Sequence, residues 1–159
     1  MNASIIAWLS AAALILVSGS AVGEEQTLKF RLITTEVDGT SFEAPGEAGH
    51  ELGTSRSVGV AVFEDGRIAF KTFIITIDSA GETGNYSGYS TYTFENGDAL
   101  TLSFTGGWDE SGEGGDYKVI SGTGAFEGAT GTGRFDGVDD PWEDAYLANG
   151  SFTLNMPGN

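Results

Sequence analysis

The sequence predicts an all-β protein in which eight antiparallel strands close into a barrel. From Gln26 onward apolar and polar residues alternate with the period of a strand, and the helical period is missing. An Asp-Gly pair at 65–66 and an Asn-Gly pair at 96–97 are typical of tight hairpin turns, because these residues tolerate a positive φ. Short antiparallel strands suit either a sandwich or a barrel. Glycines inside two of the strands, Gly59 and Gly88, favour closure because they permit strong coiling.

The predicted strands follow one another closely, near 27–37, 56–64, 67–78, 85–95, 98–106, 116–121, 129–136 and 145–155. The stretch 38–55 is the longest connection, and we expect it to lie over one mouth of the barrel. It contains the only histidine, His50, which we interpret as a loop residue because no Ser or Cys partner lies at a recognisable spacing. Between 67 and 78 both faces are apolar, so this strand is predicted to be covered on both sides.

The later strands show clearer alternation. In the strand at 85–95, Tyr86, Tyr92 and Phe94 share one face. At 100–105 and again at 151–156, apolar residues alternate with polar ones, mostly Ser and Thr, which indicates one buried and one solvated face.

The composition limits the functions that the chain can perform. Its 159 residues fit one domain, and 40% hydrophobic and 11% aromatic residues are enough for a buried core. The absence of cysteine excludes disulfides, thiolate zinc sites, iron–sulfur clusters and cysteine nucleophiles. A formal net charge of -16 repels phosphate, so we expect no nucleic-acid partner.

Residues 1–23 have the pattern of a signal peptide. An apolar run at 5–17 is followed by small residues, with Ala21 and Gly23 at the minus-three and minus-one positions of the predicted cleavage site. The run is shorter than the ~20 residues that span a bilayer. The first four residues carry no Lys or Arg, so a buried apolar helix or an uncleaved anchor is the alternative. We expect a signal helix in 1–23, a barrel domain in 24–159, secreted or periplasmic localisation, and no stable membrane span after cleavage.

The segment at 120–131, Ile-Ser-Gly-Thr-Gly-Ala-Phe-Glu-Gly-Ala-Thr-Gly, resembles a glycine-rich segment of allene oxide cyclase-like barrels, to which the dirigent proteins are close. The segments at 85–94 and 100–106 resemble the central aromatic hairpin of the same superfamily. A nucleotide-binding loop is rejected because no strand-to-helix unit follows. The resemblance implies a divergent, bacterial-type member with an eight-stranded, calycin-like barrel, an apolar interior and no cofactor. It also implies that outer faces can associate into a homo-oligomer.

The catalytic residues of plant allene oxide cyclases do not carry over to this sequence. Those enzymes use a Glu near the end of the first strand, a Cys on the third strand and a Tyr after the aromatic hairpin. Ungapped matching places Ile33, Thr72 and Trp108 at these positions. Glu36 could replace the Glu if the register slips by three, although such a shift reverses the face of the strand. We therefore expect no allene oxide cyclisation, and whether the protein is an enzyme stays open.

Three residues are candidates for catalysis: Glu36, Tyr86 and Tyr92. Glu36 could accept a proton at a barrel mouth if an apolar lining raises its pKa; the alternative is a solvated carboxylate at a strand end. The two tyrosines could donate a hydrogen bond to a ligand carbonyl, but aromatic residues inside a small barrel usually belong to its core.

Four residues are candidates for ligand contact: Thr72, Phe94, Trp108 and Phe126. Trp108, flanked by glycines, could stand at a pocket entrance or plug the end of the barrel. Phe126 is expected to seal one rim. Lys71 is expected to reach the rim or to pair with a carboxylate.

The acidic stretch 136–144 does not have the spacing of a twelve-residue calcium loop, so we interpret it as a solvated loop and assign no metal and no cofactor.

These patterns together favour an exported, cofactor-free barrel that binds a small hydrophobic molecule. The alternatives are an isomerase or cyclase that acts on an apolar substrate, and a structural or envelope interaction module whose barrel is filled by its own side chains.

Overall fold

The computed structural model of the protein describes residues 23–138 and 142–158. Its strands are β1 (Glu24–Glu43), β2 (His50–Phe63), β3 (Ile68–Ala80), β4 (Thr83–Phe94), β5 (Ala99–Asp109), β6 (Gly112–Thr123), β7 (Thr130–Gly137) and β8 (Tyr146–Met156). A short 3-10 helix, η1 (Gly124–Phe126), follows β6. The predicted signal helix at 1–23 lies, apart from Gly23, outside the described residues. Within those residues, no helix has the length and hydrophobicity needed to span a bilayer.

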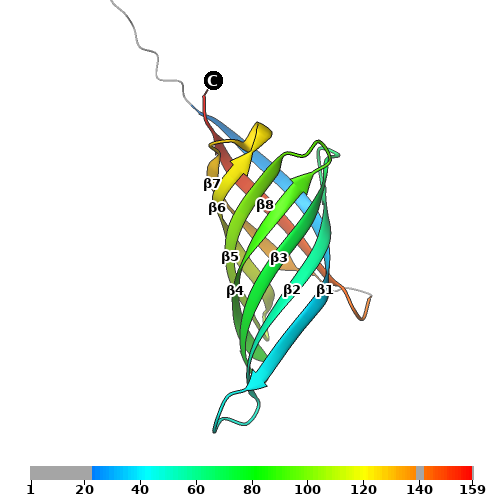
Figure 1. Cartoon of the computed structure of the whole chain (residues 1–159), viewed down its shortest axis with the longest axis vertical. Helices are drawn as coiled ribbons and strands as arrows, with labels where there is room; N and C mark the ends of the chain where they lie inside the picture. Colours follow the sequence, from blue (N-terminus) through cyan, green and yellow to red (C-terminus); the bar gives the residue numbers. More distant parts are fainter. Residues whose placement is uncertain (1–22, 139–141, 159) are drawn as a thin grey trace, which may run out of the picture.

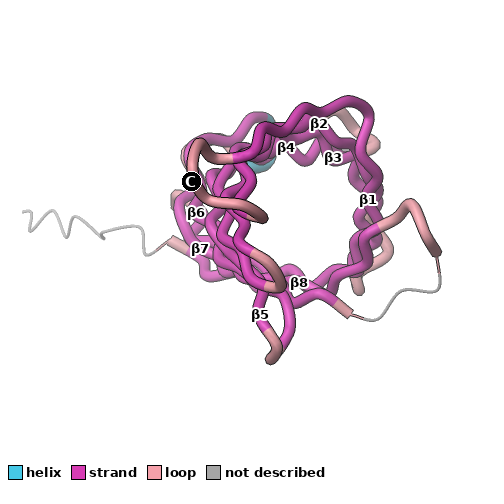
Figure 2. The backbone as a smooth tube through the Cα atoms, turned by 90° about the horizontal axis from the view of Figure 1, so that it is seen from below, coloured by secondary structure: helices cyan, strands magenta, loops and turns pink. Residues whose placement is uncertain are grey.

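Every strand pairs antiparallel with the next one in the chain, and β8 returns to pair with β1. The sheet is therefore a closed, eight-stranded antiparallel barrel, which confirms the fold that the sequence predicts. Figure 2 shows this ring of strands along its axis. Pairing of β1 with β8 from Glu24 to Thr34 joins the first strand to the last, whereas beyond Thr34 β1 pairs with β2 alone.

The two ends of the barrel are built differently. The turns after β2 and β4, helix η1 and the C-terminal residues lie at one end, which is uppermost in Figure 1 and which we name the closed end. The hairpin between β1 and β2 and the turns after β3 and β5 lie at the other, which we name the open end.

Five phenylalanines fill the closed end. The ring centroids of Phe30 and Phe152 are 4.8 Å apart, those of Phe63 and Phe94 are 5.1 Å apart, and those of Phe94 and Phe126 are 4.9 Å apart. Tilted contacts of this kind stabilise an aromatic cluster beyond the area that it buries. Phe126 comes from η1 and is 2% exposed, so it seals this rim as the sequence led us to expect.

Glycines that face the interior make room for the aromatic side chains. In six cross-strand pairs a glycine lies directly opposite an aromatic residue whose ring covers it: Gly84–Trp108, Gly88–Phe104, Gly106–Tyr86, Gly115–Phe135, Gly133–Phe152 and Gly150–Phe30. A Cβ added at Gly88 would collide with the carbonyl oxygen of Ile74 and with the ring of Phe104. Aromatic rings over strand glycines are a known way to stabilise curved sheets.

The stretch 38–55 is not the long loop that the sequence predicts. β1 continues to Glu43 and β2 begins at His50, so only a six-residue turn at 44–49 connects them. In Figure 1 the turn (cyan) projects beyond the barrel, and no residue of 38–53 lines the cavity at the open end. The alternation of apolar and polar residues fades here because both faces of this part of β1 are exposed, which removed the signal for a strand.

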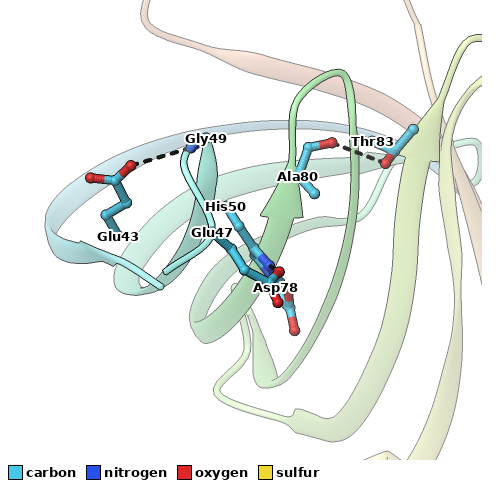
Figure 3. Close-up of polar contacts among 7 residues, drawn as sticks. All are labelled: Glu43, Glu47, Gly49, His50, Asp78, Ala80 and Thr83. Carbon is cyan, nitrogen blue, oxygen red and sulfur yellow. Dashed lines mark hydrogen bonds and ion pairs between the residues drawn. The ribbon is translucent and has the colours of Figure 1, made fainter. Parts of the chain in front are cut away.

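His50 attaches this turn to β3, as Figure 3 shows. Its Nδ1 lies 2.9 Å from a carboxylate oxygen of Glu47, and its Nε2 lies 2.6 Å from a carboxylate oxygen of Asp78. The backbone N–H of Gly49 donates to the Glu43 carboxylate at 3.3 Å on the other side of the turn. His50 is thus the first residue of a strand with two acidic partners, and not the isolated loop residue that we expected.

The outer face of β3 is uncovered, contrary to the prediction from its doubly apolar sequence. Ile68, Phe70 and Ile74 are 39%, 49% and 58% exposed. The barrel wall is a single layer, and nothing within the described residues packs over this face. Alternation was absent from the sequence because the outer positions are apolar without being buried.

Candidate functional site

The half of the interior next to the open end holds a cavity of about 700 Å³. One wall is apolar and consists of Phe73, Ile75 and Ile77 from β3 with Phe104 from β5. The adjoining part of the lining, from β1 and β2, carries the hydroxyl groups of Thr34, Ser55 and Ser57, which are all buried. The cavity therefore offers a ligand an oily face and a face of hydrogen-bonding groups.

Lys71 borders the inner part of this cavity and is only 4% exposed. Its position follows from the period of β3, in which Ala69, Lys71 and Phe73 point inward. The expectation that Lys71 reaches the rim or pairs with a carboxylate is wrong. Among the residues that the structure describes, no carboxylate lies within ion-pair distance of its Nζ atom, which donates instead to the Tyr117 hydroxyl at 3.1 Å.

Burial lowers the pKa of Lys71 from 10.5 to about 7. Aromatic rings act in the opposite direction, since their faces attract the ammonium form. The Nζ atom lies 4.3 Å from the ring centroid of Phe73 and 5.4 Å from those of Tyr92, Phe104 and Tyr117. With a pKa near neutrality, Lys71 is present both as an ammonium and as a neutral amine at physiological pH.

Two buried tyrosines continue from Lys71 as a hydrogen-bonded chain. The hydroxyls of Tyr117 and Tyr92 are 3.0 Å apart, and burial raises the pKa of both phenols above the ordinary value. Both therefore stay protonated, and each can donate one hydrogen bond. Tyr92 is fully buried behind Tyr117, so it orients that residue without bordering the cavity.

A second polar group lies nearer the open end and consists of Glu113, Tyr86 and Tyr146. Burial raises the pKa of Glu113, while the two tyrosine hydroxyls act to lower it. The Tyr86 hydroxyl also donates to the Gly114 carbonyl at 3.2 Å. The Tyr146 hydroxyl is close enough to influence Glu113, yet it is buried without a well-formed hydrogen bond within the described part of the chain.

The acidic loop before β8 forms part of the cavity rim. Glu143 and Asp144 line the cavity together with Glu36, and the Thr35 hydroxyl donates to the Asp144 carbonyl at 2.9 Å. Part of the predicted acidic stretch 136–144, residues 139–141, lies outside the described residues. Among those that are described, no three His, Asp or Glu side chains are grouped to hold a metal ion. The entrance therefore carries negative charge, whereas the inner end carries an amine.

The structure brings two of the three predicted catalytic candidates to the cavity. Glu36 borders it as an exposed residue at the rim, and Tyr86 lines it next to Glu113. Tyr92 lies behind Tyr117, as described above.

None of the four predicted ligand contacts lines the cavity. Thr72 is on the outer face of β3, and so is Ile33 on β1, which the ungapped match assigned to the family glutamate. Phe94 and Phe126 belong to the closed end. Trp108 is partly buried and stacks on Tyr86, with ring centroids 6.2 Å apart.

Sequence reasoning missed Lys71, Glu113, Tyr117 and Tyr146 as site residues. For Lys71 a signal was present, because it shares the inward face of its strand with apolar neighbours. Glu113 and Tyr117 lie on β6, where glycines at 112, 114 and 115 obscure the alternation, and Tyr146 is the first residue of β8, before the part of that strand that alternates clearly.

Comparisons with known proteins are informative for the fold only. No protein-family model and no curated protein matches the sequence. Among solved structures, the pterocarpan synthase dirigent protein GePTS1 superposes with a TM-score of 0.58 at 16% identity, over 92% of this chain and 99% of that one. The fold is that of a dirigent-like barrel. A second pterocarpan synthase dirigent protein, PsPTS1, gives a TM-score of 0.54 at 13% identity, over 86% of this chain and 97% of that one. The expected resemblance is thereby confirmed at the level of architecture.

Proposed function

We propose that the protein is exported and that its dirigent-like barrel binds a small, neutral, mostly apolar molecule with an oxygen that accepts a hydrogen bond from Lys71. The observation that carries this proposal is the cavity of about 700 Å³ with a buried amine at its inner end. Such a volume lies in the range of small-molecule sites, which combine an apolar lining with a few convergent polar groups.

The hydrogen-bonding capacity of Lys71 supports an oxygen-bearing ligand. A lysine ammonium has three donors, and Tyr117 accepts one of them. A buried donor without a partner is costly, so a ligand oxygen that reaches Nζ gains a strong hydrogen bond.

The charges at the entrance favour a neutral ligand over an anion. Glu36, Glu143 and Asp144 line the rim, and the whole chain carries a formal net charge of -16. A carboxylate or sulfonate has to pass these groups before it reaches Lys71, which lowers its rate of entry and its occupancy. A ketone, aldehyde, ester or ether oxygen meets no such barrier.

The similar solved structures give secondary support. Both are named pterocarpan synthases, that is, proteins associated with making a small organic molecule. Their identity to this chain is low, so they support a small molecule in the barrel and not the same reaction. A second candidate function is an isomerase, and Glu113 favours it, because this carboxyl group lines the cavity beside two phenols and burial raises its pKa, as suits a group that exchanges a proton with a substrate.

Two fluorescent probes test the proposed function. Prodan is a neutral naphthalene with one ketone oxygen, whereas N-phenylnaphthylamine has a similar size and no such oxygen. We expect both to bind saturably, and we expect Lys71→Met to weaken Prodan binding about tenfold while N-phenylnaphthylamine changes less than about twofold. Lys118→Met is the matched control, because Lys118 is exposed on the outside of the barrel.

A third probe, anilinonaphthalene sulfonate, adds a negative charge to the same skeleton and should bind more weakly than the neutral probes. Failure of both neutral probes to bind would overturn the proposal in favour of a barrel with a structural role. Equal loss of both probes in Lys71→Met would show that Lys71 supports the cavity without contacting the ligand oxygen.

A further inference from the structure

Lys71 is set apart from the other two lysines of the chain by its surroundings. Lys29 and Lys118 are exposed on the outer face of the barrel, whereas Lys71 is buried, borders a cavity and has no carboxylate partner among the described residues. A buried amine that faces an apolar cavity is the arrangement in which lysine acts as a nucleophile toward carbonyl compounds.

We propose that Lys71 captures neutral aldehydes or ketones of largely apolar structure as a reversible imine inside the barrel. The inference rests on the proposed ligand-binding function, because the carbonyl compound must first occupy the cavity. It goes beyond that function by assigning a covalent step and a substrate class.

The reaction needs only the groups that line this part of the cavity. The lone pair of the neutral Nζ attacks the carbonyl carbon, the C–N bond forms, and the π pair of the carbonyl moves to its oxygen. That oxygen takes a proton from the Tyr117 hydroxyl, which recovers one from the new C–N–H group, and the product is a carbinolamine. Its hydroxyl then leaves as water with the second proton of the amine, and the nitrogen lone pair completes the C=N bond. No oxidant or reductant takes part.

The geometry suits each proton movement. The Tyr117 oxygen is 3.1 Å from Nζ, so one group can serve the attacking nitrogen and the carbonyl oxygen beside it. Tyr92 lies 3.0 Å behind and can donate to Tyr117 while that residue lacks its proton. The apolar wall of Phe73, Ile75 and Phe104 limits access of water to the imine, which favours the condensed form.

Trapping with a mild reductant tests the proposal on the intact barrel. The protein is incubated with naphthaldehyde at pH about 7, where Lys71 is partly neutral, and sodium cyanoborohydride is added to convert the imine to a stable amine. Peptide mass spectrometry then locates the naphthylmethyl groups. We expect at least about tenfold more modification of Lys71 than of Lys29 or Lys118, because only Lys71 borders the cavity in which the aldehyde is held close to an amine.

Two variants separate the roles of the residues. Lys71→Met should lose the trapped adduct at this site, and the two exposed lysines in the same sample serve as internal controls. Tyr117→Phe should slow adduct formation about tenfold or more, because it lacks the proton carrier. The final extent of modification should stay the same. Since wild-type protein alone gives the site distribution, the result does not depend on the folding of either variant.

Displacement of Prodan distinguishes failure of this inference from failure of the proposed function. If naphthaldehyde displaces Prodan and Lys71 is not trapped preferentially, the imine is overturned and the ligand-binding function stands. If neither Prodan nor naphthaldehyde enters the barrel, both proposals fall. Displacement together with preferential trapping of Lys71 supports both. Naphthylmethanol, which has the same skeleton without a carbonyl group, should displace Prodan and leave no adduct.

Discussion

The Nζ atom of Lys71 on β3 and the hydroxyl oxygen of Tyr117 on β6 lie 3.1 Å apart, although β4 and β5 stand between their strands in the barrel wall. Only a closed and strongly curved sheet brings such residues together through its interior. This contact lies between the aromatic cluster of the closed end and the cavity of the open end.

Replacement of Lys71 by Met should change how stability depends on pH. The folded protein releases the proton of Lys71 near pH 7, while the unfolded chain keeps it up to about 10.5. Between these values the unfolded state binds more protons, so wild-type stability rises with pH relative to Lys71→Met, by about 1.4 kcal/mol for each pH unit. Urea unfolding of both proteins across this range measures the difference. A constant difference would show that Lys71 keeps an ordinary pKa inside the barrel.

His50 should stabilise the turn between β1 and β2 only while it is protonated. Hydrogen bonds to Glu47 and then to Asp78 raise its pKa above 6.5. A raised folded-state pKa means that the contribution is complete below pH 6.5 and is lost as pH rises through the folded-state value. Because the chain has one histidine, its imidazole NMR signal can be titrated without ambiguity. Asp78→Asn should move the midpoint down, and an unchanged midpoint would mean that this contact is absent in solution.

Gly88→Ala should destabilise the barrel by about 1–3 kcal/mol, because a methyl group there overlaps the Ile74 carbonyl and the Phe104 ring and forces both to move. The control is Gly53→Ala, where the nearest atom to a new Cβ is 3.4 Å away. Chemical denaturation compares the two variants. Equal stability of the two variants would mean that the Phe104 ring can move away from position 88 at little cost in free energy.

The two tyrosines beside Glu113 should respond differently to loss of their hydroxyls. Tyr86→Phe removes a hydrogen bond to the Gly114 carbonyl and should cost about 1 kcal/mol. Tyr146→Phe removes a buried hydroxyl that lacks a well-formed partner, so its effect on stability should stay below about 0.5 kcal/mol. Either change should raise the pKa of Glu113 further, which carbon-detected NMR can follow. A large loss of stability in Tyr146→Phe would reveal a partner for its hydroxyl.

Phe126→Ala should lower stability without changing ligand affinity. The ring is buried against Phe94 at the closed end, and removal of a buried phenylalanine costs about 3–5 kcal/mol. Prodan affinity should remain within about twofold of wild type, because the cavity is lined by other residues. Selective loss of Prodan binding in a stably folded variant would show that Phe126 contributes to the ligand site after all.

The fold could be predicted from the sequence because its determinants are local. The turn pair at 65–66 acts within the β2–β3 hairpin, and the turn pair at 96–97, the alternation at 100–105 and Gly88 act within the β4–β5 hairpin. The ends of the strands were harder to predict from the sequence. Between 38 and 55 the side chains of β1 are exposed on both faces, so no burial pattern marks the strand there.

The site was harder to predict because it depends on which residues meet across the interior. The inward position of Lys71 can be obtained from the period of β3, but its contact with Tyr117 depends on barrel closure and on the register of the intervening strands. The ungapped match to the catalytic positions of allene oxide cyclases placed two of its three residues outside the interior for a related reason. Ile33 and Thr72 point outward, while residues one position away point inward, and a shift of one residue changes the face.

The residues that stabilise the fold fill one half of the barrel, and the residues that line the cavity surround the other half. Stability and ligand contact therefore depend on largely different residues. The aromatic half can hold the sheet in shape whatever occupies the hollow half, so substitutions near the entrance are free to alter selectivity with little risk to folding. A scaffold of this kind is well suited to acquiring new small-molecule partners, in nature or in the laboratory, by changing the residues around a single retained amine.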